Sequence, residues 1–437
     1  TRPNFTVGNF MKTQPFKNKE RKEWFRGLLL KAGLPENPPL PLPDKPSIAV
    51  LPFENMSGDP EQQYFSDGIT EQIITSISKV PYIFVIARQS SFAFRDKQLS
   101  VQEIAKKLEV RYILEGSLQR SGERLRINAQ LIDATNGHHI WAENYDRKLD
   151  DIFAVQDDIC KNIMVALRVK LTMGEMARIN ADTVTNIRAY EKYLKGFEHY
   201  WRRTKEDSLI AQQLFQEAIT LDPEFIMPYI LVGWTHLDEV WFRITDKPSE
   251  SIAKAEAMVQ KAIAIHGMTA MANSLLSMIY IEKKDIDKAI AHAEKAVEQT
   301  PSSATPHFIL GMALRSNGQY EESISSIKKA IRLNPSSPIV YLNNLSWAYL
   351  GSQQYEKAIS TWKEAVERNP DYLFAHIGLT SAYWLSGMEN QAKQAAKHVL
   401  RISPKFSVGS WEKVLPYKDE ADHERIYGAM RKAGLPE

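Results

Sequence analysis

The sequence has little of what usually carries chemistry. It contains one cysteine, Cys160, in 437 residues, so no intramolecular disulfide can form, and its apolar neighbours on an expected helix favour a buried, unreactive thiol. Glycine-rich phosphate loops and nucleophile motifs are absent. The adjacent pair His138 and His139 would point to opposite faces of a strand, which is unfavourable for a shared metal. We therefore expect no catalysis, metal or cofactor in this chain.

Long apolar runs and a strong charge of one sign are also missing. No run approaches the roughly 18 residues that cross a bilayer. The formal net charge is +2, of which residues 1–46 carry +5 (nine basic minus four acidic). This balance does not indicate a strongly basic surface of the kind that binds nucleic acid. We expect no membrane span, no nucleic-acid partner and a cytoplasmic location, with a periplasmic or cell-envelope location as the alternative. The absence of an initial methionine favours a piece of a longer protein.

A regular proline spacing is the strongest positive signal. Pro301, Pro335, Pro370 and Pro404 follow one another at a nearly constant interval. Small or apolar residues recur at fixed offsets before each one, as in Ala289-x3-Ala293-x2-Ala296 before Pro301. Small residues let two helices approach closely, and proline ends the second helix. This register resembles the tetratricopeptide repeat. Two looser units upstream extend it, so we expect six helical hairpins over residues 187–404.

Such an array is expected to bind proteins on its concave side, which the first helix of each hairpin lines. Polar and aromatic side chains on these helices suit an extended peptide or a partner helix. The candidates that we place there are His307, Tyr341, Asn343, Asn344, His376 and Thr380.

The two ends of the chain carry the same segment. Residues 3–36 align without a gap on residues 404–437, and both copies close on Lys-Ala-Gly-Leu-Pro-Glu. We expect residues 405–437 to form a C-terminal cap and residues 1–33 to form a cap-like helical segment with an amphipathic helix at 19–32. The first copy is either a remnant of a preceding unit or a cap that docks on a neighbouring chain, which would make a homo-oligomer through residues 1–36.

The remaining segment predicts an α/β domain. A proline-rich linker at 34–46 suits an extended spacer. Within 47–175, apolar runs at 47–53 and 82–88 predict strands, while 64–78, 100–108 and 151–171 predict helices. Three alternating runs at 111–119, 123–133 and 138–147, joined by Ser-Gly and Asn-Gly turns, predict a meander with one wet face. The fold class is thus an α/β domain with a mixed or antiparallel sheet, followed by an all-α superhelix.

One loop of this domain is a candidate ligand site. Asn55, Ser57 and Asp59 follow the first strand, and Ser66 and Asp67 lie at the next helix. Backbone N–H groups and carboxylates converge there, where α/β domains often hold ligands. Arg88, with Ser90 and Ser91, would complete the pocket from the end of the second strand. The alternative is that these side chains only cap turns.

Several motifs are similar to those of a known family. Ile48-Ala-Val-Leu-Pro-Phe-Glu-Asn-Met-Ser-Gly-Asp-Pro60, Tyr64-Phe-Ser-Asp-Gly-Ile-Thr-Glu71, Arg111-Tyr-Ile-Leu-Glu-Gly-Ser117 and Gln130-Leu-Ile-Asp-Ala-Thr-Asn-Gly137 resemble the TolB-like amino-terminal domain that precedes tetratricopeptide repeats in bacterial regulatory proteins. That resemblance covers about residues 44–437. It implies a position after a class III adenylate or guanylate cyclase domain, or after a winged-helix DNA-binding domain with one membrane span.

These observations favour a noncatalytic signalling or scaffold module, the regulatory part of a cyclase-like protein, that binds a protein or peptide on its repeats. One alternative is a structural protein that joins head to tail through its N-terminal cap segment. A second is the periplasmic sensor portion of a winged-helix transcription regulator. An enzyme is not expected, since no segment has room for the catalytic core of a class III cyclase.

Overall fold

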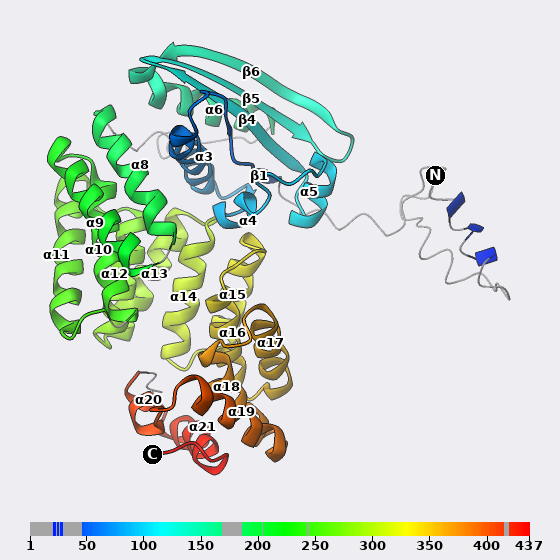
Figure 1. Cartoon of the computed structure of the whole chain (residues 1–437), viewed down its shortest axis with the longest axis vertical. Coiled ribbons are helices and arrows are strands. Elements are labelled where there is room, and N and C mark those ends of the chain that lie inside the picture. Colours follow the sequence, from blue (N-terminus) through cyan, green and yellow to red (C-terminus); the bar gives the residue numbers. More distant parts are fainter. Residues whose placement is uncertain are drawn as a thin grey trace.

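The structure is a computed structural model that describes residues 21, 22, 24, 25, 27, 28, 46–167, 186–202, 204–242, 244–414 and 419–437. Most of the predicted cap-like segment at 1–33, nearly all of the linker at 34–46 and the end of the predicted α/β domain at 168–175 lie outside these residues. The described part consists of a sheet-containing domain and a curved array of helices (Figure 1). None of its helices is both long enough and apolar enough to span a bilayer.

The sheet is mixed, as predicted. Its strands are β1 (Ser47–Val50), β2 (Glu54–Asn55), β3 (Phe84–Val85), β4 (Tyr112–Ser121), β5 (Arg124–Asp133) and β6 (His138–Lys148). The order is β3-β1-β4-β5-β6, with β2 paired to β4. β1 runs parallel to β3 and β4, whereas β4, β5 and β6 form the antiparallel meander.

Side-chain alternation decides which face of the meander is covered. Leu125, Ile127, Ala129 and Leu131 of β5 are buried, and they join a core with the helices α3 (Gln63–Ser78) and α6 (Ile152–Ala166). The opposite face is polar and internally bonded, as where Asn128 Nδ2 donates to Ser117 Oγ at 3.0 Å. The predicted wet face is therefore present, and α6 covers the other one.

Two further helices flank β1 and β3. Helix α5 (Val101–Leu108) begins at a capping box in which Ser100 and Glu103 bond each other's backbone N–H groups, as the sequence predicted. Helix α4 (Arg88–Phe92) follows β3 directly. The predicted second strand at 82–88 is thus only two residues long, because the backbone turns into α4 and Ala87 N–H donates to the carbonyl of Leu333 at 2.8 Å instead of to the sheet.

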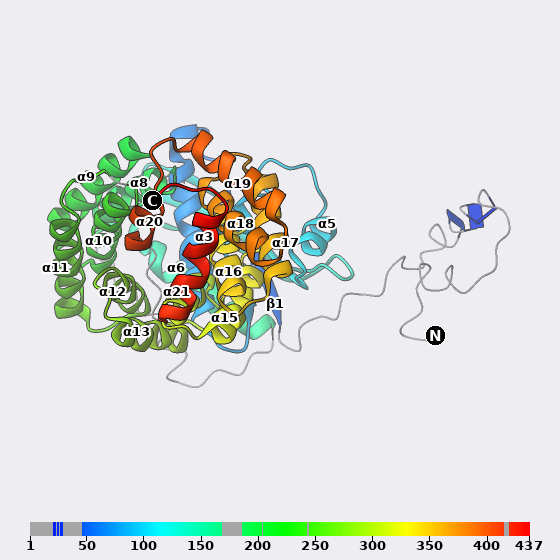
Figure 2. The same cartoon turned by 90° about the horizontal axis from the view of Figure 1, so that it is seen from below.

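The rest of the described chain forms tetratricopeptide-type hairpins, which confirms the repeat prediction. The hairpins are α8 (Ile187–Arg202) with α9 (Lys205–Leu221), α10 (Ile226–Trp241) with α11 (Pro248–His266), α12 (Ala270–Glu282) with α13 (Ile286–Gln299), α14 (Ala304–Ser316) with α15 (Tyr320–Leu333), α16 (Ile339–Gly351) with α17 (Tyr355–Arg368), and α18 (Leu373–Leu385) with α19 (Glu389–Ile402). Seen from below, the successive hairpins follow a curved path (Figure 2).

Close helix crossings depend on small residues. A Cβ built on Gly378 of α18 would lie 2.1 Å from the indole of Trp362 on α17, and one on Gly311 would lie 2.4 Å from Ile327. Ala358, Ala365 and similar alanines of the second helices are fully buried. The recurring small residues therefore set the spacing within each hairpin.

The array ends on α20 (Val408–Val414) and α21 (Glu420–Lys432). Helix α21 packs on α18, where Ser381 Oγ donates to the carbonyl of Ile426 at 3.1 Å. Asp422 accepts from Tyr320 OH at 2.6 Å, and Arg425 donates to the carbonyls of Leu350 and Gly351. This segment covers the apolar end of the last hairpin.

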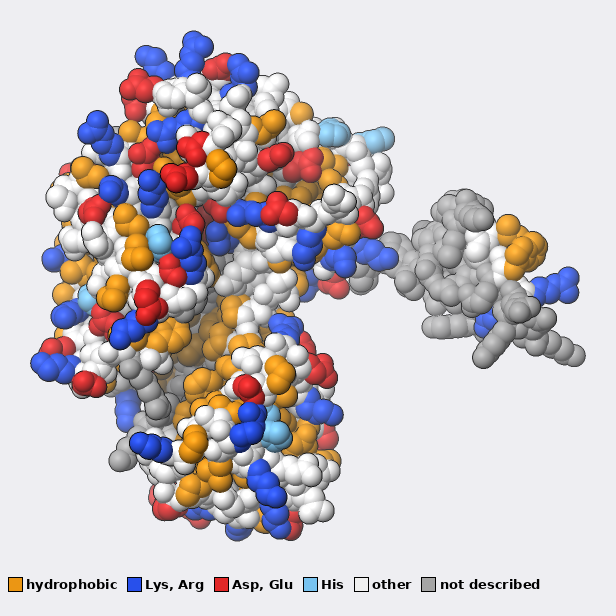
Figure 3. All heavy atoms as spheres, viewed as in Figure 1, with side chains coloured by type: hydrophobic (Ala, Val, Ile, Leu, Met, Phe, Trp, Pro, Cys, Tyr) orange, Lys and Arg blue, Asp and Glu red, His pale blue; other side chains and the backbone are white. Residues whose placement is uncertain are grey.

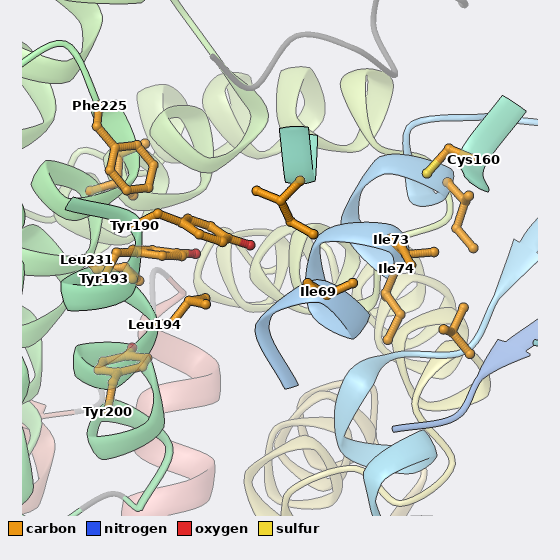
Figure 4. Packing of buried hydrophobic residues seen from close by; sticks show 14 of the residues in the cluster. Ile69, Ile73, Ile74, Cys160, Tyr190, Tyr193, Leu194, Tyr200, Phe225 and Leu231 are labelled. Atoms are coloured by element: carbon orange, nitrogen blue, oxygen red, sulfur yellow. The ribbon is translucent and has the colours of Figure 1, made fainter. Parts of the chain in front are cut away.

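The α/β domain is docked on the array by a continuous apolar core. Ile69, Ile73 and Ile74 of α3 lie across from Tyr190 and Leu194 of α8 in one buried cluster (Figure 4). Gly68 permits this approach, because a Cβ there would lie 2.2 Å from Leu194 Cδ2. The first hairpin is therefore part of the α/β domain's core.

A second contact ties the same domain to hairpins much later in the chain. Ser90 Oγ donates to Asn334 Oδ1 at 2.6 Å and accepts from Ser336 N–H at 2.8 Å. Ser302 Oγ donates to the carbonyls of Val80, at 3.3 Å, and Ile83. Ser302, Asn334 and Ser336 lie in the connections on either side of the hairpin α14/α15. The α/β domain thus spans from the first hairpin to the fourth.

Candidate functional site: the concave groove

A large hollow follows the inner side of the array. We call it the concave groove; it has a volume of about 1850 Å³. The first helices α8, α10, α12, α14 and α16 line its length, and α3 and α4 of the α/β domain close one end. In the space-filling view it appears as a hollow with hydrophobic side chains on its walls (Figure 3).

Helical periodicity explains which side chains of the first helices form the walls of the groove. On α12 the lining positions Met271, Ser274, Met278 and Ile281 recur every three or four residues, which is one face of an α-helix. The second helices pack behind the first, so the inward side chains face the hollow. The same spacing recurs on α10 and α14.

The chemistry of the walls is apolar, with methionine and aromatic rings prominent. The apolar lining side chains include Met227, Met271, Met278 and Met312, together with Trp234, Trp241, Phe242, Phe308, Tyr341 and Phe374. Several remain accessible: Trp241 is 37%, Phe242 51% and Phe374 40% exposed. Flexible thioethers adapt to different apolar partners, and exposed apolar patches of this kind mark interaction sites.

Charged groups gather where the α/β domain closes the groove. Arg88 Nε lies 3.2 Å from Glu71 Oε2, and Arg88 Nη2 lies 3.9 Å from Asp67 Oδ2. The guanidinium also lies over the ring of Phe92 at 4.0 Å and the ring of Trp201 at 5.4 Å. This stack joins α4 to the first hairpin. Among the described residues, no group of His, Cys, Asp or Glu side chains could hold a metal ion.

Burial controls the electrostatics of this pair. It raises the pKa of the Glu71 carboxyl, although the nearby Arg88 opposes the shift. The pKa of Arg88 is lowered, again mainly by burial, which outweighs the attraction of Glu71 and Asp67. Both charges are therefore held at a desolvation cost that their mutual attraction offsets only in part.

The predicted ligand-loop residues fall into two groups. Asn55, Ser57 and Asp59 form a local turn: Asn55 Oδ1 accepts from Ser57 N–H at 3.0 Å, and Asp59 Oδ1 accepts from Glu61 N–H at 3.0 Å. Asp67 and Arg88 lie instead in the charged cluster, where Asp67 also pairs with Arg95.

The other three predicted serines, Ser66, Ser90 and Ser91, are fully buried and take no part in these ion pairs. Ser66 is fully buried inside α3, and its hydroxyl has no hydrogen-bond partner among the described residues. The same holds for the buried hydroxyl of Ser91, whereas Ser90 bonds the array. The structure thus brings Asp67 and Arg88 together, whereas Asn55 and Asp59 bond the backbone of their own turn.

The six predicted concave residues are mostly engaged within the array. His307 Nε2 bonds the carbonyl of Pro301 at 2.9 Å, and His376 Nε2 bonds that of Pro370 at 2.8 Å. Asn343 accepts from Trp362 Nε1 at 3.0 Å. These three side chains are buried and lie off the groove lining.

Of the remaining three residues, two bond within their own helices and one lines the groove. Asn344 and Thr380 donate to carbonyls one turn back in their own helices, those of Val340 and His376. Tyr341 does line the groove, where its ring stacks on Phe308 with centroids 4.0 Å apart. The methionines and tryptophans that dominate the groove are missing from the prediction, although their period of three to four along each first helix was a readable signal.

Protein-family models match both parts of this chain. One described as the second domain of HilA/YgeH-like transcriptional regulators matches residues 44–162. Two tetratricopeptide-repeat models match residues 275–338 and 340–372. The repeat family is thus confirmed for the C-terminal region. The α/β domain matches the HilA/YgeH model, and its TolB-like identity stays a prediction.

Similar proteins include "Putative adenylate cyclase 3" of Rhizobium meliloti (strain 1021), which is 42% identical over 241 residues, or 55% of this chain. The aligned part is 41% of that protein, so the chain spans about two fifths of its relative. Solved structures with a partial likeness include YrrB, described as a TPR protein with an unusual peptide-binding site (18% identity, TM-score 0.34, covering 46% of this chain and 98% of that one). Another is PilF of Pseudomonas aeruginosa (13% identity, TM-score 0.39, covering 50% and 93%).

Proposed function

We propose that this chain is a noncatalytic regulatory module of a larger protein of the adenylate or guanylate cyclase type, and that its concave groove holds an amphipathic segment of a partner protein. The observation that carries the proposal is the apolar, methionine-rich lining of the groove. The similarity to the Rhizobium protein named as an adenylate cyclase supports the choice of parent.

The shape of the groove favours one helix. It is a hollow of about 1850 Å³ that runs along five first helices between mainly apolar walls. A helix of 14 residues, about 21 Å long and 10–12 Å across, is the kind of extended element that such a hollow can hold. An amphipathic helix with apolar anchors at i, i+3, i+4 and i+7 would bury those anchors among the methionines and rings.

We also propose that the α/β domain is TolB-like, as its sequence motifs indicate. The same domain matches the model of HilA/YgeH-like regulators. A small ligand at Asp67 and Arg88 is part of this proposal. A thermal-shift screen checks it, since a stabilising compound should lose its effect in Asp67→Ala. A compound that stabilises the protein and Asp67→Ala equally would contradict that site.

Peptide binding tests the groove. The probe is a fluorescent amphipathic helical peptide with Leu and Trp anchors at i and i+4, with a scrambled peptide as its control. Met271→Glu and Met312→Glu place a charge on the lining, so each should weaken binding at least tenfold. Ile210→Glu changes an exposed apolar residue of α9 that is 43% accessible and outside the groove lining, and it should leave binding unchanged. Equal binding by all three variants would refute the proposed site.

A transcription regulator is the second candidate, favoured by the model matched at residues 44–162. The two candidates differ in the effector that the module controls. In the full-length parent protein, Met312→Glu should alter cyclic nucleotide formation under the first proposal and promoter binding under the second.

A further inference from the structure

The N-terminal copy of the duplicated segment precedes the α/β domain. Its described residues 21, 22, 24, 25, 27 and 28 are helical, and Trp24 is 63% and Leu28 43% exposed. These two side chains are four positions apart and therefore share one helix face. In Figure 3 the hydrophobic side chains of this segment are open to view. An amphipathic helix with such a face is expected to pack against another surface.

The C-terminal copy shows which kind of surface this segment covers. Helix α21 buries Ile426, Tyr427 and Met430 against the array, chiefly on α18, the first helix of the last hairpin. At the constant offset of 401, Ile426 corresponds to Phe25 and Ala429 to Leu28. The equivalent positions of the N-terminal copy are therefore suited to a first helix of an array.

The N-terminal copy is nevertheless unsuited to the place that α21 occupies. Asp422 and Arg425, which bond Tyr320 and the carbonyls of Leu350 and Gly351, correspond to Arg21 and Trp24. An arginine cannot accept the tyrosine hydrogen bond, and an indole cannot reach two carbonyls as a guanidinium does. The surface of α18 that α21 packs on is, moreover, already covered.

Within the described part of the chain, the first helices that remain open are those that line the concave groove. We propose that the helix expected at residues 19–32 binds there in the same chain, with Trp24, Phe25 and Leu28 among the methionines of α12 and α14. The inference rests on the proposed function, because it makes this segment an internal competitor of the partner.

The connecting chain is long enough. The segment that follows the helix, from residue 32 to Pro46, allows a span of up to about 50 Å. Pro46 is anchored near the groove, since its carbonyl accepts from Phe84 N–H at 2.8 Å, and Ala87 and Arg88, a few residues further, line the groove. The helix expected at 19–32 has 14 residues, the length considered above for a partner helix.

Thiol protection in the full chain tests this inference. Met312→Cys places a reporter on the groove wall, and the native Cys160 stays silent because it is buried and its pKa is raised to about 12. The maleimide reaction of the new cysteine should be at least tenfold slower with the native N-terminal helix than with Trp24→Glu and Leu28→Glu combined. Lys397→Cys on the exposed side of α19 is the control, whose rate should be the same in both backgrounds and would reveal any unfolding.

Two outcomes overturn the inference. Equal rates at Met312→Cys in the two backgrounds would show that the helix does not cover the groove. Protection that disappears on dilution from about 100 to 1 µM would assign the helix to a second copy of the chain. The proposed function is tested separately by the fluorescent peptide on the Trp24→Glu, Leu28→Glu protein: if it binds there without any protection in the native chain, the function stands and this inference fails.

Discussion

At the scale of single residues, buried histidines fix the start of two repeats. His307 and His376 were predicted on the concave face from their positions in the first helices. Each bonds the carbonyl of the proline that ends the preceding repeat. Sequence periodicity places a residue on a helix face, but it does not show whether a nearby carbonyl will bond the side chain. The same limit applies to the pairing of Glu71 with Arg88, whose partners come from different elements.

Burial gives His307 a measurable effect on stability. It lowers the pKa of this histidine to about 4, below the ordinary value of about 6.5. The stabilisation is therefore complete above pH 6.5 and is lost as the pH falls toward 4, by about 3 kcal/mol in total. In His307→Gln this loss should be absent, so the difference in unfolding free energy between the two proteins should shrink with falling pH.

Urea unfolding at pH 7 and pH 4.5 measures that difference. His376, whose pKa is also lowered by burial, is present in both proteins and cancels. A difference that is the same at both pH values would contradict the assignment.

At the scale of elements, local rules predicted most of the fold. The alternation along β5, the capping box at Ser100 and the proline spacing each gave the correct element, because each depends only on residues close in sequence. The strand at 82–88 was wrong in length because Ala87 bonds Leu333, a partner in the array that is far away along the chain. The small residues correctly predicted close packing between helices. The tight contact of Gly378 with Trp362, however, depends on the size of a ring in the facing helix.

That close contact predicts opposite effects for two similar substitutions. Gly378→Ala forces a Cβ to within 2.1 Å of the buried Trp362 ring and should destabilise the protein by about 1–3 kcal/mol. At Gly428 in α21 the nearest atom to an added Cβ is Glu424 Oε1 at 3.9 Å, so Gly428→Ala should stabilise by about 0.5–1 kcal/mol through helix propensity. Urea unfolding of both variants checks the pair, and destabilisation by Gly428→Ala of the same size would contradict this account of the crossing.

At the scale of the whole molecule, the sequence predicted two parts but not how they meet. The contacts between them join α3 to α8, and α4 to the connection after α15, and no local pattern links these segments. The groove also arises only at this scale, because α3 and α4 close it. The apolar face of each first helix was readable, whereas the shared hollow was not.

The docking contact predicts a difference between neighbouring serines. Ser90→Ala removes the hydroxyl that donates to Asn334 and accepts from Ser336, and Asn334 is only 2% exposed. We expect a loss of about 1–3 kcal/mol and faster proteolysis in the connection after α15. Ser91→Ala deletes a buried hydroxyl that has no partner among the described residues, so it should be neutral or stabilising. Equal losses in the two variants, measured by urea unfolding, would argue against a docking role for Ser90.

The bridge that the α/β domain makes between the first and fourth hairpins fixes the pitch of the superhelix between those points. A ligand that moved these two hairpins apart would strain the hydrogen bonds of Ser90 and Ser302 or detach the α/β domain from the array. Occupancy of the inner surface and seating of the sheet domain are then thermodynamically linked, and each must alter the other by the same free energy.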